Sequence, residues 1–178
     1  MFDLDTFLAD CVAATAEAQP RHALKELLAR AVAQPAAVAQ ALPATRAGID
    51  RLHVSPELTV LNVVWGPGMR IYPHDHRMWA AIGIYTGQED NTFYRRSPEG
   101  VVPSGGTQLQ EQDVALLGDD TIHAVFNPRR QHTGAIHVYG GDFFTQPRSE
   151  FDPETLVEGP YRVEHTLALF DAANAQRC

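Results

Sequence analysis

The chain has 178 residues, of which 44% are hydrophobic, and its formal net charge is −8. This length and apolar content suffice for one buried core and favour a single domain over residues 1–178. The acidic balance, without a dense stripe of lysine or arginine, excludes a typical nucleic-acid-binding protein, because neutralising phosphates requires clustered cations.

Residues 1–45 are expected to be helical, because apolar residues recur there at helical spacing. Prolines divide this segment into two helices and a short third one: Pro20, Pro35 and Pro43. Acidic residues stand where a secretory signal would have a basic flank, and no run approaches the roughly 18 apolar residues of a membrane span. The two cysteines, Cys11 and Cys178, suggest no disulfide framework. We therefore expect a cytoplasmic protein without membrane partners, either a monomer or a small homo-oligomer.

Residues 50–145 predict a β-barrel. Short runs of β-branched and aromatic residues are separated by turn-forming residues at intervals of roughly 8 to 12 residues, which is typical of a sandwich or barrel. These runs are LTVLNVVW, AAIGIY, NTFYRR, DVALL, TIHAVFN and GAIHVYG. Residues 160–174 return to helical spacing. The expected fold is mainly β, a small antiparallel barrel with a helical segment before it and a helix after it.

The stretch YPHDHRMW, residues 72–79, contains a candidate pair of metal ligands. Residues i and i+2 of a strand point the same way, so His74 and His76 project from one face and Asp75 from the other. Taken alone, the pair could equally be a polar strand end. His123, however, enters a later strand that a barrel would return beside the pair. The sequence thus predicts a divalent metal bound by three imidazoles.

The pattern around these histidines resembles the two-part motif of the cupin superfamily, whose fold is a double-stranded β-helix. The matching positions are Gly68, His74, His76, Gly87, His123 and Asn127. In the usual cupin pattern a glutamate ligand follows the second histidine by four or five residues, and here those positions are Ala80 and Ala81. We interpret Glu89 and Asp90, which come after Gly87, as solvated turn residues and not as replacements.

A ligand set without the carboxylate resembles that of one cupin branch, the cysteine dioxygenase-like thiol dioxygenases, which use three histidines. The run WGPGMRIYPHDH resembles their W-G-x-G and H-D-H segment, and the resemblance covers about residues 60–145. GAIHVYGG resembles their Ser-x-His-x-Tyr segment, with His137 and Tyr139 present and Ala135 in the position of the serine. Ala81 stands where the mammalian enzymes have a cysteine crosslinked to the tyrosine, and bacterial members lack that crosslink too.

This resemblance implies an enzyme that oxidises a small thiol bearing a carboxylate, such as cysteine or 3-mercaptopropionate, to its sulfinate with O₂. It implies one Fe(II) ion as cofactor, although three imidazoles bind Ni, Cu or Zn at least as tightly. Tyr139 would donate a hydrogen bond near the O₂ or the substrate, and His137 would orient Tyr139.

The residues that would bind the substrate are less clearly indicated. The family commonly binds the substrate carboxylate through an arginine, because a planar guanidinium contacts both oxygens. The candidates are Arg51, Arg70, Arg77 and Arg95. Met78 and Trp79, which follow the histidine pair, either wall the pocket or belong to the core.

Two other functions stay open at this point. A three-histidine cupin could cleave a carbon–carbon bond in an aromatic ring or a β-diketone. A non-catalytic cupin could bind a metal or a ligand as a sensor or store, and the alanine at position 135 is the feature that leaves this interpretation open.

Overall fold

The computed structural model describes residues 2–175, so Cys178 lies outside the described part of the chain. Three helices precede the strands, as predicted: α1 (Leu4–Ala14), α2 (Pro20–Val32) and α3 (Pro35–Ala41). Asp3 caps α1 by accepting a hydrogen bond from the backbone N–H of Thr6 at 2.8 Å. Pro20 and Pro35 lie in the first turns of their helices, where a missing N–H removes no helical hydrogen bond. The last helix, α4, spans Val163–Ala175.

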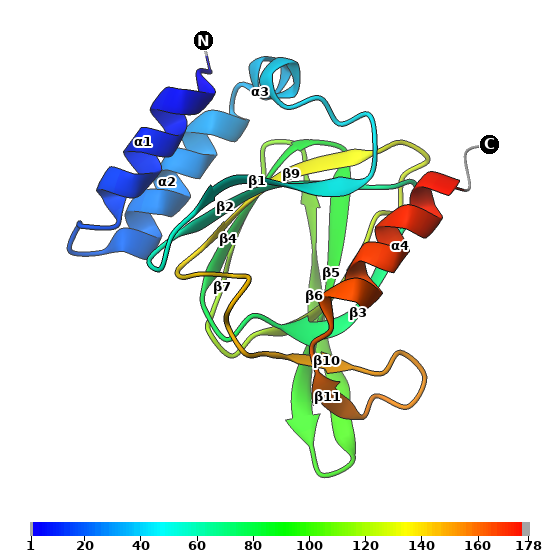
Figure 1. The fold of residues 1–178 in the computed structure, drawn as a ribbon. Helices are drawn as coiled ribbons and strands as arrows, with labels where there is room; N and C mark the ends of the chain where they lie inside the picture. The colour runs from blue at the N-terminus through cyan, green and yellow to red at the C-terminus, as the bar shows by residue number, and fades with distance from the viewer. Residues whose placement is uncertain (1, 176–178) are drawn as a thin grey trace.

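The strands form two antiparallel sheets that face each other (Figure 1). The first sheet contains β1 (Gly48–Val54), β2 (Thr59–Trp65), β9 (Thr133–Tyr139), β4 (Ala80–Thr86) and β7 (Val114–Leu117), in that spatial order. The second contains β11 (Glu158–Pro160), β10 (Ser149–Phe151), β3 (Arg70–Asp75), β8 (Ile122–Phe126), β5 (Gln88–Ser97) and β6 (Gly100–Gln110). The orders β2-β9-β4-β7 and β3-β8-β5-β6 are those of a jelly roll, which confirms the predicted double-stranded β-helix.

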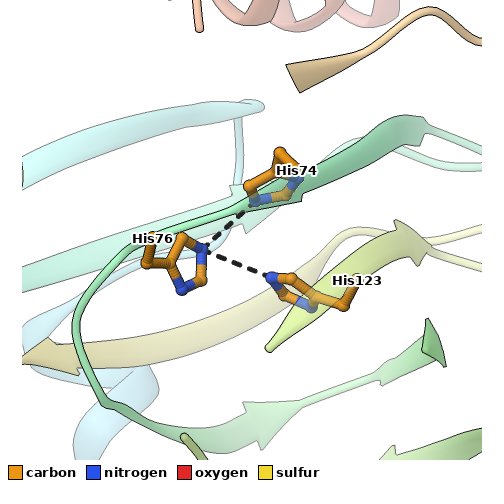
Figure 2. A group of neighbouring side chains, drawn as sticks. All are labelled: His74, His76 and His123. Atoms are coloured by element: carbon orange, nitrogen blue, oxygen red, sulfur yellow. Dashed lines mark hydrogen bonds between the residues drawn. The ribbon is translucent and has the colours of Figure 1, made fainter. Parts of the chain in front are cut away.

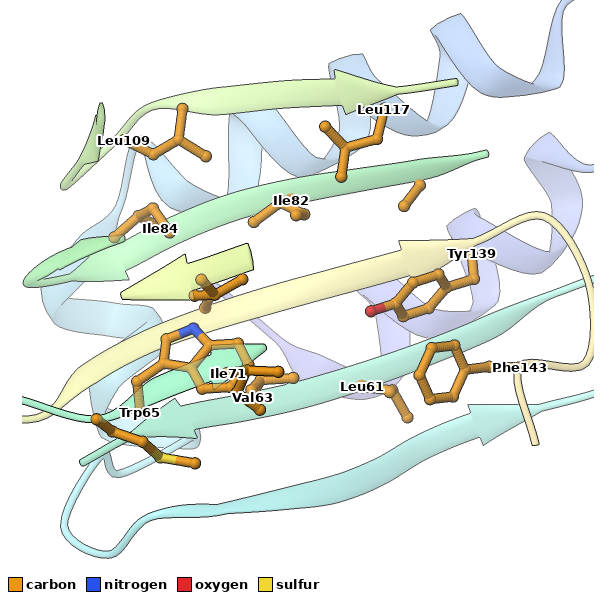
Figure 3. Close-up of a cluster of buried hydrophobic side chains, with 14 of the residues drawn as sticks. Leu61, Val63, Trp65, Ile71, Ile82, Ile84, Leu109, Leu117, Tyr139 and Phe143 are labelled. Atoms are coloured by element: carbon orange, nitrogen blue, oxygen red, sulfur yellow. The ribbon is translucent and has the colours of Figure 1, made fainter. Parts of the chain in front are cut away.

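The central strands of the first sheet, β2, β9 and β4, are buried on both faces. Its inner face contributes side chains such as Leu61 and Ile82 to the core between the sheets (Figure 3). Its outer face, with Ile136 and Val138, packs under the N-terminal helices, where Cys11 is also buried. Every residue of β2 and β9 is buried. This double cover explains why these two strands read as nearly continuous apolar runs instead of alternating ones.

The second sheet and the C-terminal helix form the other side of the barrel. Helix α4 lies beside β3, away from α1 and α2 (Figure 1). Strand β5 begins at Gln88, ahead of the predicted run NTFYRR, and pairs with the long strand β6. Within residues 2–175, no helix has the length and apolar character needed to span a bilayer.

Candidate metal centre

Three histidines meet inside the barrel on the second sheet. His74 on β3 and His123 on β8 are cross-strand partners, and His76 directly follows the end of β3. Nε2 of His76 lies 3.2 Å from Nε2 of His74 and 3.3 Å from Nε2 of His123 (Figure 2). All three side chains are buried. The structure therefore brings together the three residues that the sequence predicted as metal ligands.

Hydrogen bonds at the outer nitrogens orient two of the rings. Nδ1 of His74 lies 3.0 Å from the carbonyl oxygen of Tyr72, and Nδ1 of His123 lies 2.6 Å from Oδ1 of Asn91. Both acceptors require a proton on Nδ1, so the Nε2 atoms of these two rings carry lone pairs directed toward His76. Because Nε2 of His76 supplies at most one proton, at least one of the two close contacts is not a hydrogen bond.

A cation accounts for this arrangement of lone pairs. Nitrogens that bind one ion at about 2.1 Å in tetrahedral or octahedral geometry lie roughly 3.0 to 3.4 Å apart. The two Nε2 separations at His76, 3.2 and 3.3 Å, fall in that range. The donor set therefore fits a divalent metal ion bound through three Nε2 atoms.

Burial keeps the three imidazoles in the neutral form that binds metal. It lowers the pKa of the His74 imidazole from 6.5 to about 4, and the positive charge of Arg148 acts in the same direction. Burial, together with the neighbouring histidines, also holds the pKa values of His76 and His123 well below 6.5. A metal ion at this site would therefore compete with few protons at neutral pH.

We expect the metal-free protein to lose stability in mild acid. The unfolded chain protonates these histidines near 6.5, whereas the folded pKa values are about 4 for His74 and well below 6.5 for His76 and His123. The unfolded state thus binds more protons, and the free energy of unfolding falls as the pH drops from about 6.5, by up to roughly 1.4 kcal/mol per pH unit for each histidine. Thermal denaturation from about pH 7 to about pH 5 measures this slope. His123→Gln should reduce the slope, and an unchanged slope would contradict the assignment.

A cavity of about 30 Å³ adjoins the three imidazoles. His137 and Tyr139 also line it, so the structure places the predicted pair beside the cluster. The Tyr139 hydroxyl lies 3.0 Å from Nδ1 of His137. The centroid of the Tyr139 ring is 5.0 Å from the centroid of the His76 ring. Burial raises the pKa of the Tyr139 phenol, which therefore keeps its proton at neutral pH. The remaining wall is largely apolar: Ile49, Leu61, Val63, Trp65, Ile71, Val125, Phe143, Tyr161 and Thr166.

The residues considered from the sequence for substrate binding do not line this cavity: Arg51, Arg70, Arg77, Arg95, Met78 and Trp79. Arg51 and Arg70 stack on aromatic rings elsewhere, at 3.7 and 3.6 Å from the ring centroids. Arg77 pairs through Nε with the buried carboxylate of Asp75 at 2.6 Å, on the face opposite the histidines. Met78 belongs to the core. The structure therefore does not place these side chains in the cavity lining.

Arg148, which the sequence analysis did not single out, packs against two residues of the cavity wall, although it is not itself among the lining residues. It lies in the loop between β9 and β10, and its guanidinium carbon is 4.0 Å from the ring centroids of both Phe143 and Tyr161, which line the cavity. The guanidinium also donates to the carbonyl oxygen of Phe143. Its Nε is buried and has no hydrogen-bond partner among residues 2–175. A loop residue carries no periodic signal, so only the fold could place it here.

Glu89 is fully buried on β5, which corrects its interpretation as a solvated turn residue. Its carboxylate accepts hydrogen bonds from Nε1 of Trp65 at 2.6 Å and from Nδ2 of Asn91 at 2.9 Å. Oε2 lies 3.4 Å from Nε2 of His137. Burial alone would raise the pKa of Glu89, but the neighbouring His137 and the donors Asn91 and Trp65 hold that pKa below its usual value. The barrel therefore contains a buried carboxylate outside the histidine cluster.

No protein-family model matches the sequence. The strand order decides the fold. The chain has a cupin fold. Among solved structures, it is similar to a cupin-family protein with a double-stranded β-helix fold from Methanocaldococcus jannaschii, at 10% identity and a TM-score of 0.46, over 58% of this chain and 87% of that chain.

Two further solved structures are similar to this chain over a smaller share of their own length. Peruvianin-I, a cysteine peptidase from the latex of Thevetia peruviana, is 15% identical over 48% of this cupin-fold chain and 51% of its own, with a TM-score of 0.41. An oxalate oxidase in complex with the substrate analogue glycolate is 14% identical over 48% of this chain and 42% of its own, with a TM-score of 0.41. This chain thus spans about half of these two proteins or less.

Proposed function

We propose that this protein is a metal-dependent thiol dioxygenase that converts a small thiol bearing a carboxylate into its sulfinate. The observation that carries the proposal is the convergence of three imidazoles without an acidic ligand in the described part of the chain. Ala80 and Ala81, where a cupin glutamate would stand, are fully buried and apolar. A site with this donor set and no anion of its own favours an anionic ligand from the substrate.

The cofactor that suits this reaction is one Fe(II) ion held by Nε2 of His74, His76 and His123. When bound, iron(II) supplies the redox chemistry that a thiol and O₂ lack on their own, and its positive charge favours the thiolate form of the substrate. Both atoms of O₂ add to the sulfur, which loses four electrons while O₂ gains four. The reaction therefore needs no further reductant or organic cofactor.

The side chains around the cavity support a small, dry binding site. Apolar side chains supply half of the lining residues, and the ring of Tyr139 lies 5.0 Å from the ring of His76 between centroids. Through its hydrogen bond, His137 fixes the direction of the Tyr139 hydroxyl. We assign to Tyr139 a hydrogen bond with the substrate, and to His137 the orientation of Tyr139.

Arg148 supports the choice of a substrate with a carboxylate. Its guanidinium lies between two aromatic rings of the cavity wall, and its buried Nε has no partner in the described residues. A guanidinium can bind both oxygens of a carboxylate, and stacking between rings limits the orientations that it adopts. We assign the substrate carboxylate to Arg148.

The test is O₂ consumption after anaerobic reconstitution with Fe(II). The panel contains cysteine, 3-mercaptopropionate, a thiol without a carboxylate, a β-diketone and a catechol. We expect one O₂ per molecule of a carboxylate-bearing thiol, and a product heavier than the thiol by two oxygen atoms. Uptake with the carbon substrates alone, or metal binding without uptake on any compound, would overturn the proposal.

A further inference from the structure

Nε2 of His137 is a buried polar atom that makes no hydrogen bond among the described residues. The family segment that the sequence resembles has a serine two residues before this histidine, and here that residue is the fully buried Ala135. Leaving a buried N–H without an acceptor costs about 1 to 3 kcal/mol. The ring therefore needs another acceptor, and the acidic side chain within reach comes from the opposite sheet.

That side chain is Glu89. Its Oε2 lies 3.4 Å from Nε2 of His137 and accepts a 2.6 Å hydrogen bond from the indole of Trp65. Its Oε1 accepts from Nδ2 of Asn91 at 2.9 Å. Trp65 and His137 belong to the first sheet, whereas Glu89 and Asn91 belong to the second. The carboxylate thus spans the interior of the barrel, and two strong donors hold it in one orientation toward the histidine.

From this geometry we infer that Glu89 is the positioning residue of the His137–Tyr139 pair, replacing the hydroxyl that Ala135 lacks. With Glu89 facing Nε2, the proton of the ring belongs on Nε2. In the neutral ring this leaves Nδ1 to accept the single proton of the Tyr139 hydroxyl, 3.0 Å away, and fixes the place of the phenol oxygen in the cavity wall. The phenol oxygen then meets the substrate as a hydrogen-bond acceptor, which differs from the donor role that the family resemblance implies. Glu89 acts through these two side chains and does not touch the substrate.

The same carboxylate has a second neighbour, Asn91, whose Oδ1 accepts from Nδ1 of the predicted ligand His123 at 2.6 Å. This contact offers a different route by which Glu89 could act, namely by orienting a metal ligand. The two routes differ in what they predict. Positioning of Tyr139 leaves the metal content intact, whereas positioning of His123 changes it.

The first measurement needs no variant and does not depend on the proposed activity. In the zinc-loaded protein labelled with ¹⁵N-histidine, long-range ¹H–¹⁵N spectra report which ring nitrogens carry protons, and the signals of His137 are identified by their loss in His137→Gln. We expect Nε2 of His137 to be protonated. A bare Nε2 in the wild-type protein would overturn the inference even if every variant failed to fold.

The second measurement uses Glu89→Gln, with Asp90→Asn as a matched control. Asp90 is the adjacent acid on β5, is half-buried and accepts from Nε2 of Gln88 at 2.6 Å. Glu89→Gln should change the His137 ring signals and leave the zinc content at the wild-type level, and Asp90→Asn should change neither. Unchanged His137 signals, or a loss of zinc in Glu89→Gln, would assign Glu89 to another role.

The kinetic part of the test rests on the proposed function. With the preferred thiol, Glu89→Gln should lower kcat about tenfold and change KM less than about threefold. Because Glu89 acts through Tyr139, the double variant with Tyr139→Phe should be no more than about twofold slower than the slower single variant. Multiplicative effects of the two substitutions would contradict the inference. If no thiol is oxidised at all, the proposed function fails, while the ring-proton measurement still decides the role of Glu89.

Discussion

Replacing His123 with alanine should abolish metal retention. The substitution removes one of three ligands from a site that has no acidic ligand to replace it within residues 2–175. Loss of a partner that merely orients a ligand already lowers metal affinity about 10- to 100-fold, so we expect a loss of more than about 100-fold here. Metal analysis after Fe(II) or Zn(II) loading and gel filtration measures the effect, and thiol-dependent O₂ uptake should disappear with the metal.

The matched control for this variant is His53→Ala. His53 lies on β1 and does not line the cavity. It should keep the metal content and activity of the wild-type protein. Wild-type metal content in His123→Ala would show that the ion binds elsewhere, and the reactivity inferred for three imidazoles would no longer apply. Circular dichroism separates loss of the ligand from loss of the fold.

Replacing Arg148 with glutamine should raise KM for thiols that carry a carboxylate. A hydrogen-bonded charge pair contributes about 1.5 to 3 kcal/mol, which corresponds to a rise in KM of roughly 10- to 100-fold. The kcat should change much less, because the guanidinium lies against Phe143 and Tyr161 and is not among the metal ligands. Steady-state O₂ uptake with 3-mercaptopropionate, and with a thiol of similar size without a carboxylate, separates the two parameters.

Arg51→Gln provides the control for loss of an arginine stacked on an aromatic ring. Arg51 lies 3.7 Å from the ring centroid of Phe144, which, unlike Phe143 and Tyr161, does not line the cavity. It should leave KM within about twofold of the wild-type value. An equal rise in KM for both kinds of thiol in Arg148→Gln would mean that Arg148 supports the cavity wall and does not bind the carboxylate.

The sequence was informative where local periodicity determines geometry. The two-residue spacing of His74 and His76 placed both side chains on one face, and a barrel returned His123 to lie beside them. The same spacing placed His137 and Tyr139 on one strand face, and the family resemblance implied the contact between them that the structure contains. These residues lie in or next to regular strands, where neighbouring side chains alternate between faces regardless of the distant parts of the chain.

Sequence reasoning failed for residues whose burial or position depends on contacts with distant parts of the chain. Glu89 follows a glycine turn, which suggests exposure, but β5 begins before it and turns its carboxylate into the barrel. Donors from distant segments, Trp65 and His137, make that burial possible. Arg148 lies in an irregular loop whose path depends on the packing of Phe143 and Tyr161. The strand β6, GVVPSGGTQLQ, lacks the expected apolar pattern because much of it is exposed.

The cavity of about 30 Å³ is small for a thiol of several heavy atoms, so we expect part of its wall to move when such a substrate enters. Most of the wall belongs to strands whose backbones are joined by sheet hydrogen bonds, but Tyr161 and Thr166 come from α4 and the residues before it. Their hydroxyls are 2.6 Å apart, and Thr166 lies 3.0 Å from the hydroxyl of Tyr72. Outward movement of Tyr161 and Thr166 would break these hydroxyl contacts and leave the backbone hydrogen bonds of both sheets intact. We therefore expect the movement of Tyr161 and Thr166 to set an upper limit on how fast each new substrate molecule can be captured.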